Sequence, residues 1–323
     1  NYLSNFTLTQ LHNTENNLNK VVTQLSSGRR IVTAADDVSG FNIVQRLTRV
    51  SKGIEQGMMN AQDGISLAQV ALAATQQMID NYQVVRQKAL QAANETVNPD
   101  ERKQISVEIA KIIEAMDQLA KSVDFNEYKL FDSTTLKNKG VHSLSKTYTL
   151  SDGTTVSVQM FQFMIQYGPA AKSGATSFGA TGTGDNRIFA PTFTDTVFSR
   201  VLGIQIKDQD YLKIASNLQT TYGFGVGSAE SKMLGFAARV QDLINILSDQ
   251  AANMGSTINQ LNAIVAFNEQ AKTTIDESAS RIRDVDFAKA TAQYQQLQIL
   301  MQSGTAMLAQ ANQLPQFALK LIG

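Results

Sequence analysis

The sequence contains no cysteine and only two histidines, at positions 12 and 142. The absence of cysteine excludes disulfide bonds, thiolate nucleophiles and sulfur-ligated metal ions. The two histidines lie too far apart for a two-histidine metal site, and neither belongs to the H-E-x-x-H pattern of zinc proteases. We therefore expect no cofactor, no metal and no enzyme activity.

The sequence also lacks net charge, because 28 lysines and arginines balance 28 aspartates and glutamates among 323 residues. Without a basic excess, bulk charge does not favour nucleic acid or an anionic membrane. No apolar run approaches the roughly 18 to 20 residues that a membrane span needs. We expect no nucleic-acid partner and no membrane insertion. The first basic residue is Lys20, so we also expect no cleaved secretory signal.

Proline is scarce, and none of the four prolines lies in the first 98 residues. Apolar residues there recur in steps of four and three, which predicts long helices packed side by side. The predicted seam consists of Ile54, Met58, Ala61, Ile65, Ala68, Leu72, Ile79, Tyr82, Ala89 and Ala93. Asn98 and Pro99 favour the start of a second helix. We expect these two helices to form an antiparallel hairpin.

The C-terminal part repeats the heptad pattern over residues 240–265 and 287–311. Residues 132–232 differ in composition, since "TYTLSDGTTVSVQMFQF" predicts a β-hairpin around Asp152 and Gly153 and "SGATSFGATGTGD" predicts a loop. The sequence therefore predicts a mainly α fold. Its long paired N- and C-terminal helices form a coiled coil and a helical bundle, with a β-rich central insertion.

Charge is scarce at both ends of the chain. Residues 285–323 contain three charged side chains, and residues 1–25 contain only Glu15 and Lys20. An exposed helix normally carries a charged face, and isolated helices of this length are marginal in water. We expect the two segments to pair with each other and to be covered by further subunits. The alternative is an ordinary helix pair inside a globular core.

Several segments together resemble the bacterial flagellins. These are "LSSGRRIVTAADDVSG", "NAQDGISLAQVAL", "VVRQKALQAAN", "FNEYKLFD" and "SRIRDVDFAKATAQYQQLQILMQSGTAMLAQANQLPQFALKLIG". The resemblance covers about residues 1–132 and 236–323. It implies a structural subunit that polymerises into the flagellar filament for motility, after unfolded export through the flagellar type III apparatus. The implied location is the extracellular filament, with a periplasmic filament as an open alternative. The implied partners are copies of the same chain, an export chaperone, and the cap and hook-junction proteins.

The resemblance also implies four parts. Residues 1–25 and 285–323 would form a terminal coiled coil in the inner tube, and residues 26–40 a connector. Residues 41–131 and 233–284 would form a helical bundle, and residues 132–232 a β-rich variable outer domain. The implied subunit interface comprises Leu11, Leu18, Leu25, Phe287, Tyr294, Leu297, Met301 and Leu308. The connector residues are Gly28, Arg29, Arg30, Asp36, Asp37 and Gly40. The glycines would permit turns, and the four charged residues would pair locally or between subunits.

Two other functions remain open at this point. The hook–filament junction protein shares the terminal helices, although "MLAQANQLPQFALKLIG" resembles the flagellin ending specifically. A secreted enzyme or adhesin displayed on helical arms would need a catalytic or binding motif in its insert, and residues 132–232 contain none.

Many flagellins are bound by a Toll-like receptor through the helix that here contains "NYQVVRQKALQAAN". The receptor contacts are chiefly an arginine and a leucine, aided by a glutamate on the next helix. Alignment puts Val84 and Lys88 at the first two positions, while Glu108 keeps the glutamate. Loss of the guanidinium and burial of an ammonium predict weak or no receptor recognition. Neutral variation of a helix surface is the alternative.

Overall fold

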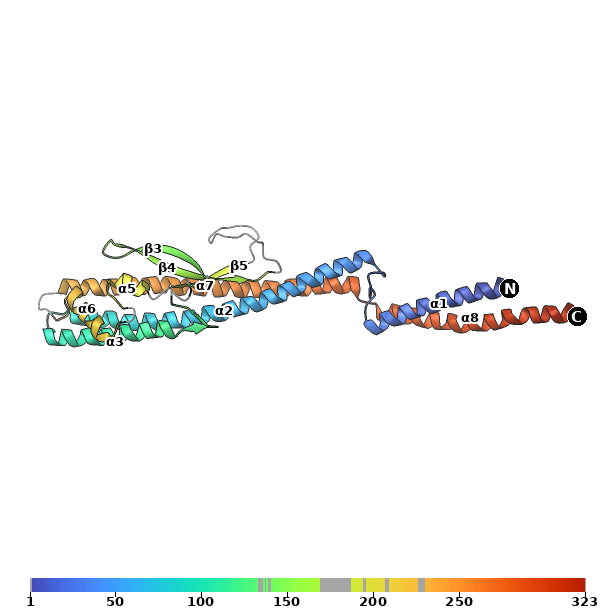
Figure 1. The fold of residues 1–323 in the computed structure, drawn as a ribbon, viewed down its shortest axis with the longest axis horizontal. Helices are drawn as coiled ribbons and strands as arrows, with labels where there is room; N and C mark the ends of the chain where they lie inside the picture. Colours follow the sequence, from blue (N-terminus) through green and yellow to red (C-terminus); the bar gives the residue numbers. More distant parts are fainter. Residues whose placement is uncertain are drawn as a thin grey trace. The chain divides into compact units, whose positions relative to one another are not determined.

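The computed structural model describes residues 2–132, 136, 138, 141–168, 187–193, 196–206, 209–225 and 230–322. Its long helices are α1 (Tyr2–Ser27), α2 (Val38–Ala92), α3 (Pro99–Ser122), α7 (Glu230–Arg283) and α8 (Phe287–Ile322) (Figure 1). Two shorter helices are α5 (Thr196–Leu202) and α6 (Tyr211–Tyr222). The strands are β1 (Asp124–Phe125), β2 (Tyr128–Lys129), β3 (His142–Thr149), β4 (Thr155–Gln166) and β5 (Arg187–Phe193). The mainly α fold with a few central strands is confirmed.

The chain divides into two compact units. The first contains Asn1–Gly53 and Gln270–Gly323, and the second contains Ile54–Glu269. Helices α2 and α7 contribute residues to both units. This division differs from the four parts implied by the resemblance, which concern positions in an assembled filament and stay a prediction.

In the first unit, α1 and α8 pair in antiparallel orientation, so that the N- and C-termini lie at the same end of the pair (Figure 1). A methyl group at Gly304 would lie 3.0 Å from Leu11 Cδ1, and one at Gly28 would lie 3.8 Å from Phe287 Cζ. Both contacts fit one continuous register, since 17 residues separate Leu11 from Gly28 and Phe287 from Gly304. The heptad seam of the two helices is therefore unbroken along this length.

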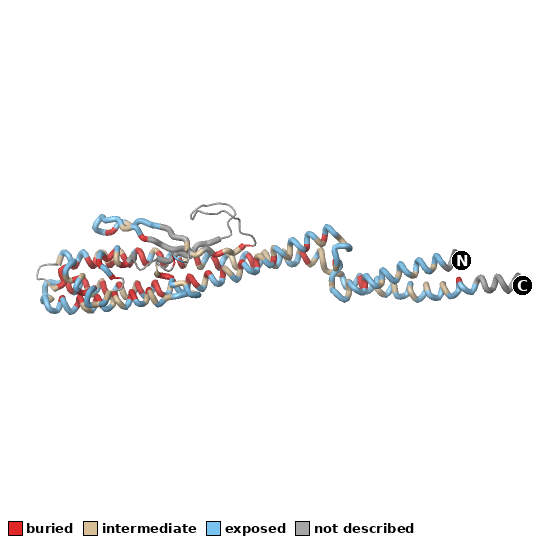
Figure 2. Tube along the Cα trace, in the orientation of Figure 1, coloured by how far each residue is buried: buried red, intermediate tan, exposed pale blue. Residues whose placement is uncertain are grey.

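The second unit contains the large hydrophobic core, which lies between α2, α3 and α7 (Figure 2). Helix α3 begins where the sequence predicted. The Asn98 side chain accepts a hydrogen bond from the Glu101 amide at 2.9 Å, and the Glu101 carboxylate accepts one from the Asn98 amide at 3.3 Å. This reciprocal capping box satisfies two amides that the helix leaves free.

The predicted positions of the apolar seam on α2 are only partly correct. Ile54, Ala61, Ala68, Tyr82 and Ala89 are buried as predicted. The alternate positions of the seam lie one residue earlier than predicted, at Gly57, Gly64, Ala71, Met78 and Ala92. The predicted residues Met58, Ile65, Leu72, Ile79 and Ala93 are only half-buried.

Two of these five positions are glycines, and their contacts explain the shift there. A Cβ at Gly57 would overlap the carbonyl oxygen of Tyr167, and a Cβ at Gly64 would overlap the Ile165 side chain. Asn60 and Asn268 hold the same chain segment by donating hydrogen bonds to the carbonyls of Gln166 and Tyr167, at 3.0 and 2.9 Å. The last residues of β4 thus lie directly on α2, which only a helix face without side chains permits.

The predicted hairpin is confirmed, since β3 and β4 pair in antiparallel register from Thr149–Thr155 to His142–Gln162. Gly153, in the turn between β3 and β4, has φ +79°. Strand β5 pairs antiparallel with the other edge of β4. The predicted loop "SGATSFGATGTGD" lies outside the described residues.

The sequence analysis did not predict α5 and α6. Their buried residues join the core of the long helices, and α6 packs against α3, where Gln219 Nε2 donates to Ser106 Oγ at 3.0 Å. The core residues contributed by residues 196–225 are Phe198, Val201, Leu202, Ile204, Ile206, Ile214, Ala215, Leu218, Tyr222 and Phe224. The range 132–232 therefore adds helices and core, besides strands.

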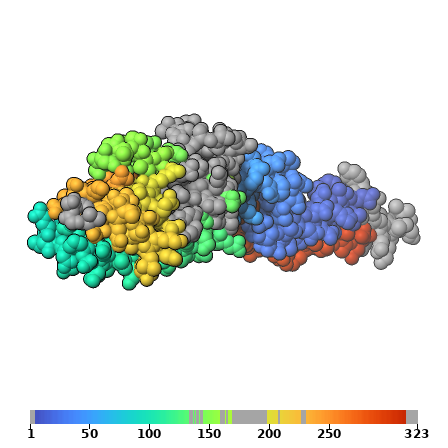
Figure 3. All heavy atoms as spheres, turned by 60° about the vertical axis from the view of Figure 1, so that its left-hand side comes forward, coloured from blue at the N-terminus to red at the C-terminus, as the bar shows by residue number. Residues whose placement is uncertain are grey.

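The β3–β4 hairpin is held on α7 by polar contacts. Lys146 Nζ and the Tyr148 hydroxyl donate to Asp249 Oδ2 at 2.6 and 3.0 Å, and Ser151 Oγ donates to Asp242 Oδ2 at 2.7 Å. Figure 3 shows the green hairpin against the orange atoms of α7. The hairpin is therefore anchored by hydrogen bonds at one end of the sheet and by close backbone packing on α2 at the other.

We predict that Gly57→Ala destabilises the second unit by about 1–3 kcal/mol, because the methyl group must displace the Tyr167 backbone. Gly235→Ala in α7 is the matched control, since its methyl group would have no neighbour within 4 Å. This change should stabilise the unit by up to about 1 kcal/mol, as alanine favours helix. Urea unfolding of both variants tests the prediction, and equal midpoints would contradict it.

Candidate functional site

The connector begins where α1 ends. Gly28 follows the helix with φ +69°, a left-handed backbone conformation that residues other than glycine rarely adopt. Its carbonyl accepts a hydrogen bond from the Val285 amide at 3.1 Å. The turn that ends α1 is thus fixed to the short segment between α7 and α8.

The two arginines of the connector bind this same segment. Arg29 forms an antiparallel bridge with Asp284, and the amides of Arg30 and Ile31 both donate to the Arg283 carbonyl, at 2.6 and 3.3 Å. The Arg30 guanidinium donates to the Ile282 carbonyl at 2.6 Å. A cation at the carbonyl end of α7 is favourable because the helix dipole is negative there.

The two aspartates serve the other half of the connector. Asp36 Oδ2 accepts hydrogen bonds from the amides of Val32 and Thr33, at 3.2 and 3.0 Å, and Asp36 Oδ1 lies 3.1 Å from Lys20 Nζ. The hydrogen bond from Thr33, followed by that from Lys20, lowers the pKa of Asp36 to about 2. The negative charge thus holds the loop to α1.

Asp37 caps α2. Its Oδ1 accepts the Gly40 amide at 2.9 Å. Gly40 is buried, and a Cβ there would overlap the Asp37 carboxylate and lie 2.7 Å from Ile31 Cδ1. In the described connector, the arginines and aspartates take these partners and do not pair with one another. Asp36 thus has a local ion-pair partner in Lys20, and pairing of these charges between subunits stays a prediction.

Four residues of this region were not singled out from the sequence: Lys20, Arg283, Asp284 and Asp286. Asp286 Oδ1 accepts the amides of Ala288 and Lys289, at 3.0 and 3.2 Å, and so caps α8. Burial alone would raise the pKa of Asp284, but hydrogen bonds from Ser280 and Arg283 hold it below its ordinary value. An aspartate directly before a heptad run was the signal for the cap, whereas nothing local indicated the other three.

The predicted seam residues of the terminal pair lie between α1 and α8. Leu11, Leu18 and Leu25 on α1 are half-buried, as are four of the five residues predicted on α8. Those four are Tyr294, Leu297, Met301 and Leu308. Phe287 differs, since it is 56% exposed beside Gly28. One partner helix thus covers only part of each seam side chain.

The outer sides of the pair expose further apolar residues. They are Phe6, Leu8 and Val22 on α1, and Ile299, Leu300 and Met307 on α8. Ile299 is 65% and Met307 62% exposed, and residues 290–319 contain no charged side chain. Exposed apolar surface of this extent is typical of an interaction face.

The positions aligned with receptor contacts lie in the second unit. Val84 is 40% exposed on α2, and Lys88 of the same helix forms an ion pair with Glu108 of α3. The carboxylate of Glu108 therefore already has a basic partner within the chain.

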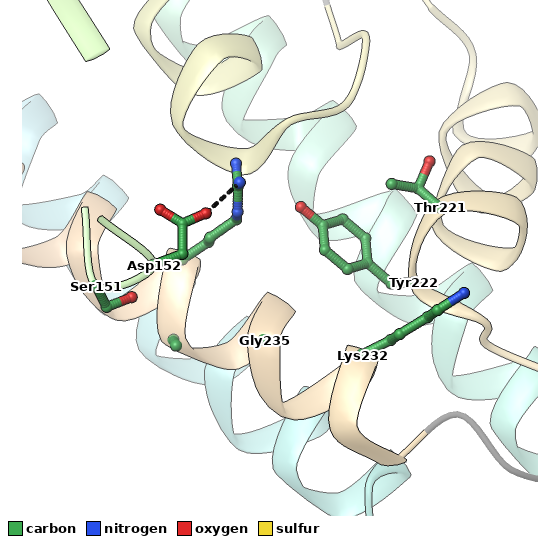
Figure 4. Close-up of a pocket in the computed structure, with 8 residues that line it drawn as sticks. Ser151, Asp152, Thr221, Tyr222, Lys232 and Gly235 are labelled. Carbon is green, nitrogen blue, oxygen red and sulfur yellow. Dashed lines mark hydrogen bonds and ion pairs between the residues drawn. The ribbon is translucent and has the colours of Figure 1, made fainter. Parts of the chain in front are cut away.

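A hollow in the second unit lies between the hairpin turn, the end of α6 and the start of α7 (Figure 4). Arg239 Nη2 lies 2.5 Å from Asp152 Oδ2, and the Tyr222 hydroxyl donates to the Leu202 carbonyl at 2.6 Å. Hydrogen bonds from Thr154, then the Arg239 charge, lower the pKa of Asp152. These contacts hold the turn on α7.

The described parts of the chain also contain no group of three histidine, cysteine, aspartate or glutamate side chains that could hold a metal ion. Among the described helices, none combines the length and apolar character that crossing a membrane requires.

Comparison with known proteins gives consistent matches. Residues 1–135 match the family model of the bacterial flagellin N-terminal helical region, and residues 237–322 match that of the C-terminal helical region. The flagellar filament 33 kDa core protein of Treponema phagedenis is 30% identical over 313 residues, which cover 97% of this chain and 94% of the relative. Flagellin of Bacillus subtilis is 29% identical over 319 residues, covering 98% and 96%. The crystal structure of Bacillus cereus flagellin aligns with a TM-score of 0.35 and 15% identity, over 65% of this chain and 88% of that one.

We predict that Asp36 titrates near pH 2 in the unpolymerised protein and that Lys20→Gln moves its pKa upward, toward 3.8. Because the folded pKa lies below the unfolded value, Asp36 stabilises the connector fully above about pH 4, and this stability is lost as the pH falls toward 2. Carboxyl NMR titration measures both values. Lys289→Gln removes the same charge elsewhere and should leave Asp36 unchanged, while a wild-type pKa near 3.8 would refute the contact.

Proposed function

The chain belongs to the bacterial flagellin family and is a structural subunit of the flagellar filament, and we propose that its paired terminal helices form the inner tube of that filament. The observation that carries this proposal is the outer surface of the α1–α8 pair, which is poor in charge and exposes large apolar side chains among amides and hydroxyls. Many copies packed side by side would cover this surface, which two helices alone leave in water.

The proposed arrangement of the other parts follows the chain. Residues 26–40 connect the inner tube to a bundle of residues 41–131 and 233–284, and the β3–β4 hairpin within residues 132–232 faces outward. The exposed side chains of Thr147 and Thr149 on β3 fit an outward position. Helices α5 and α6 contribute to the core of the second unit, so we assign them to the bundle and only the β3–β4 hairpin to the filament surface.

The other partners and the location are part of the same proposal. Self-polymerisation into a filament follows from the family. We propose in addition an export chaperone, the cap and the hook-junction proteins as partners, type III export, and an extracellular filament, with a periplasmic filament as the alternative. The flagellin family is structural, and we propose no catalytic activity. Both named relatives are flagellin or filament proteins, which favours a filament subunit over a hook–filament junction protein.

Leu297→Asp tests the inner tube. The carboxylate would replace an apolar side chain of the helix seam and, once neighbouring subunits exclude water, cost on the order of several kcal/mol in each subunit. Polymerisation onto filament seeds should therefore fail, while the second unit keeps its thermal unfolding midpoint. Leu212→Asp is the matched control, because Leu212 is 61% exposed on α6 outside the proposed tube. Removal of residues 285–323 should act like Leu297→Asp. Normal filaments from either variant would refute the tube assignment.

We further propose that the receptor described above recognises this protein weakly or not at all. The double change Val84→Arg with Lys88→Leu should raise the potency of the monomer about tenfold or more, since it restores a guanidinium and an apolar contact and frees Glu108 from its ion pair. Val70→Arg, which places an arginine elsewhere on α2, is the control. A receptor reporter assay measures potency. A wild-type monomer as potent as a flagellin with both matched residues would contradict the proposal.

A further inference from the structure

The turn of the β3–β4 hairpin contains an Asp-Gly sequence, Asp152-Gly153. In such a sequence the glycine amide nitrogen can attack the carboxyl carbon of the aspartate, because glycine has no side chain to obstruct the approach. The nitrogen and the carboxyl carbon close a five-membered succinimide ring, and one carboxyl oxygen leaves as water. Water then opens the ring at its other carbonyl and gives isoaspartate, in which the main chain runs through the former side chain.

The chain contains one other Asp-Gly sequence, Asp63-Gly64, and the fold treats the two differently. Asp63-Gly64 lies within the continuous helix α2, and Gly64 is buried against Ile165. Attack by its amide would require α2 to unwind, since each amide inside a helix is bonded to a carbonyl one turn earlier. Residues 151–154 of the hairpin turn are all exposed, so water reaches them. Only the hairpin turn can therefore react without loss of a long helix.

Hydrogen bonds hold both reacting groups of the turn. The Gly153 amide donates to the Leu150 carbonyl at 3.0 Å. Asp152 Oδ1 accepts the amide and the hydroxyl of Thr154 at 2.9 and 2.6 Å, and Asp152 Oδ2 lies 2.5 Å from Arg239 Nη2 (Figure 4). The Thr154 hydrogen bonds, then the Arg239 charge, lower the pKa of Asp152. Because the carboxyl group must be protonated before its oxygen can leave as water, these contacts oppose ring closure.

Arg239 is the one of these partners that lies outside the hairpin. It belongs to α7, where its Nη1 also donates to the Val201 carbonyl at 3.3 Å. Leu150 and Thr154, in contrast, move together with the turn. The ion pair between Arg239 and Asp152 therefore exists only while the hairpin turn lies on α7.

We propose that Asp152 is a site of covalent self-modification, converted to isoaspartate through a succinimide with Gly153, and that the ion pair with Arg239 controls the conversion. The reaction is slow while the hairpin turn lies on α7 and fast once the turn leaves it. It needs no enzyme, oxidant or reductant. One carbon–nitrogen bond forms, one carbon–oxygen bond breaks, the amide proton leaves in the released water, and ring opening takes up one water again.

Isoaspartate makes release of the hairpin turn permanent. It adds one carbon to the main chain of a turn that holds Thr149 and Thr155 in register. It also attaches the carboxylate directly to the Cα atom, so that the carboxylate no longer reaches Arg239 as the aspartate side chain does. The contact of Ser151 with Asp242 is then the remaining polar anchor described between this turn and α7.

Arg239→Gln tests the control of the reaction. During incubation of the monomer at neutral pH, isoaspartate at position 152 should form about tenfold faster than in wild type, the factor expected from one lost charge-assisted hydrogen bond. Lys232→Gln is the matched control, because Lys232 lines the same hollow without an ion pair to Asp152, and it should react like wild type. Electron-transfer mass spectrometry distinguishes isoaspartate from aspartate at each position.

Two further measurements complete the test. Position 63 should stay unmodified in all three proteins, since conversion there would report unwinding of α2. In protein isolated with isoaspartate at position 152, the β3 amides next to the turn should exchange with solvent about tenfold faster, and those of α3 at the wild-type rate. Equal rates in Arg239→Gln and wild type, conversion at position 63, or unchanged exchange in β3 would each overturn the proposal. All are measured on the monomer, so they leave the filament assignment untouched.

Discussion

A helix pair cannot cover its own apolar surface, and this limit governs the ends of the chain. Each of α1 and α8 offers one stripe to the other, yet Ile299 and Met307 remain mostly exposed on the far side. Charged side chains would keep such a pair soluble, but residues 290–319 have none. The α1–α8 pair thus leaves apolar surface uncovered within one chain, whereas the second unit buries its own core.

The sequence predicted the features that depend on local pattern. The start of α3 at Asn98, the hairpin at Gly153 and the seam of α8 all follow from caps, turns and spacing. The first part of the α2 seam was misplaced because a search for apolar residues passes over Gly57 and Gly64, which are buried because they have no side chain. Their role depends on a strand about 100 residues away, and no local pattern carries that information.

The connector likewise combines features that local sequence predicts with contacts that it does not. Gly28 and the cap at Asp37 could be recognised locally, whereas the bond from Arg30 to Ile282 joins residues 252 positions apart. Short helices such as α5 are also beyond local reasoning, since seven residues hold a helix only when tertiary packing supplies the stability. What the sequence alone could not supply is in each case a contact between distant segments.

The backbone bonds between the connector and the α7–α8 turn have a consequence for folding order. In an extended chain, pairing α1 with α8 would close a loop of more than 250 residues, which costs considerable entropy. Once α2 and α7 lie together, the residues flanking Gly28 and Val285 are already neighbours, and α1 and α8 then meet as the two arms of a helical hairpin. Because the bundle already brings the two ends close, the loop that remains to be closed is short, and we expect α1 and α8 to pair after α2 and α7.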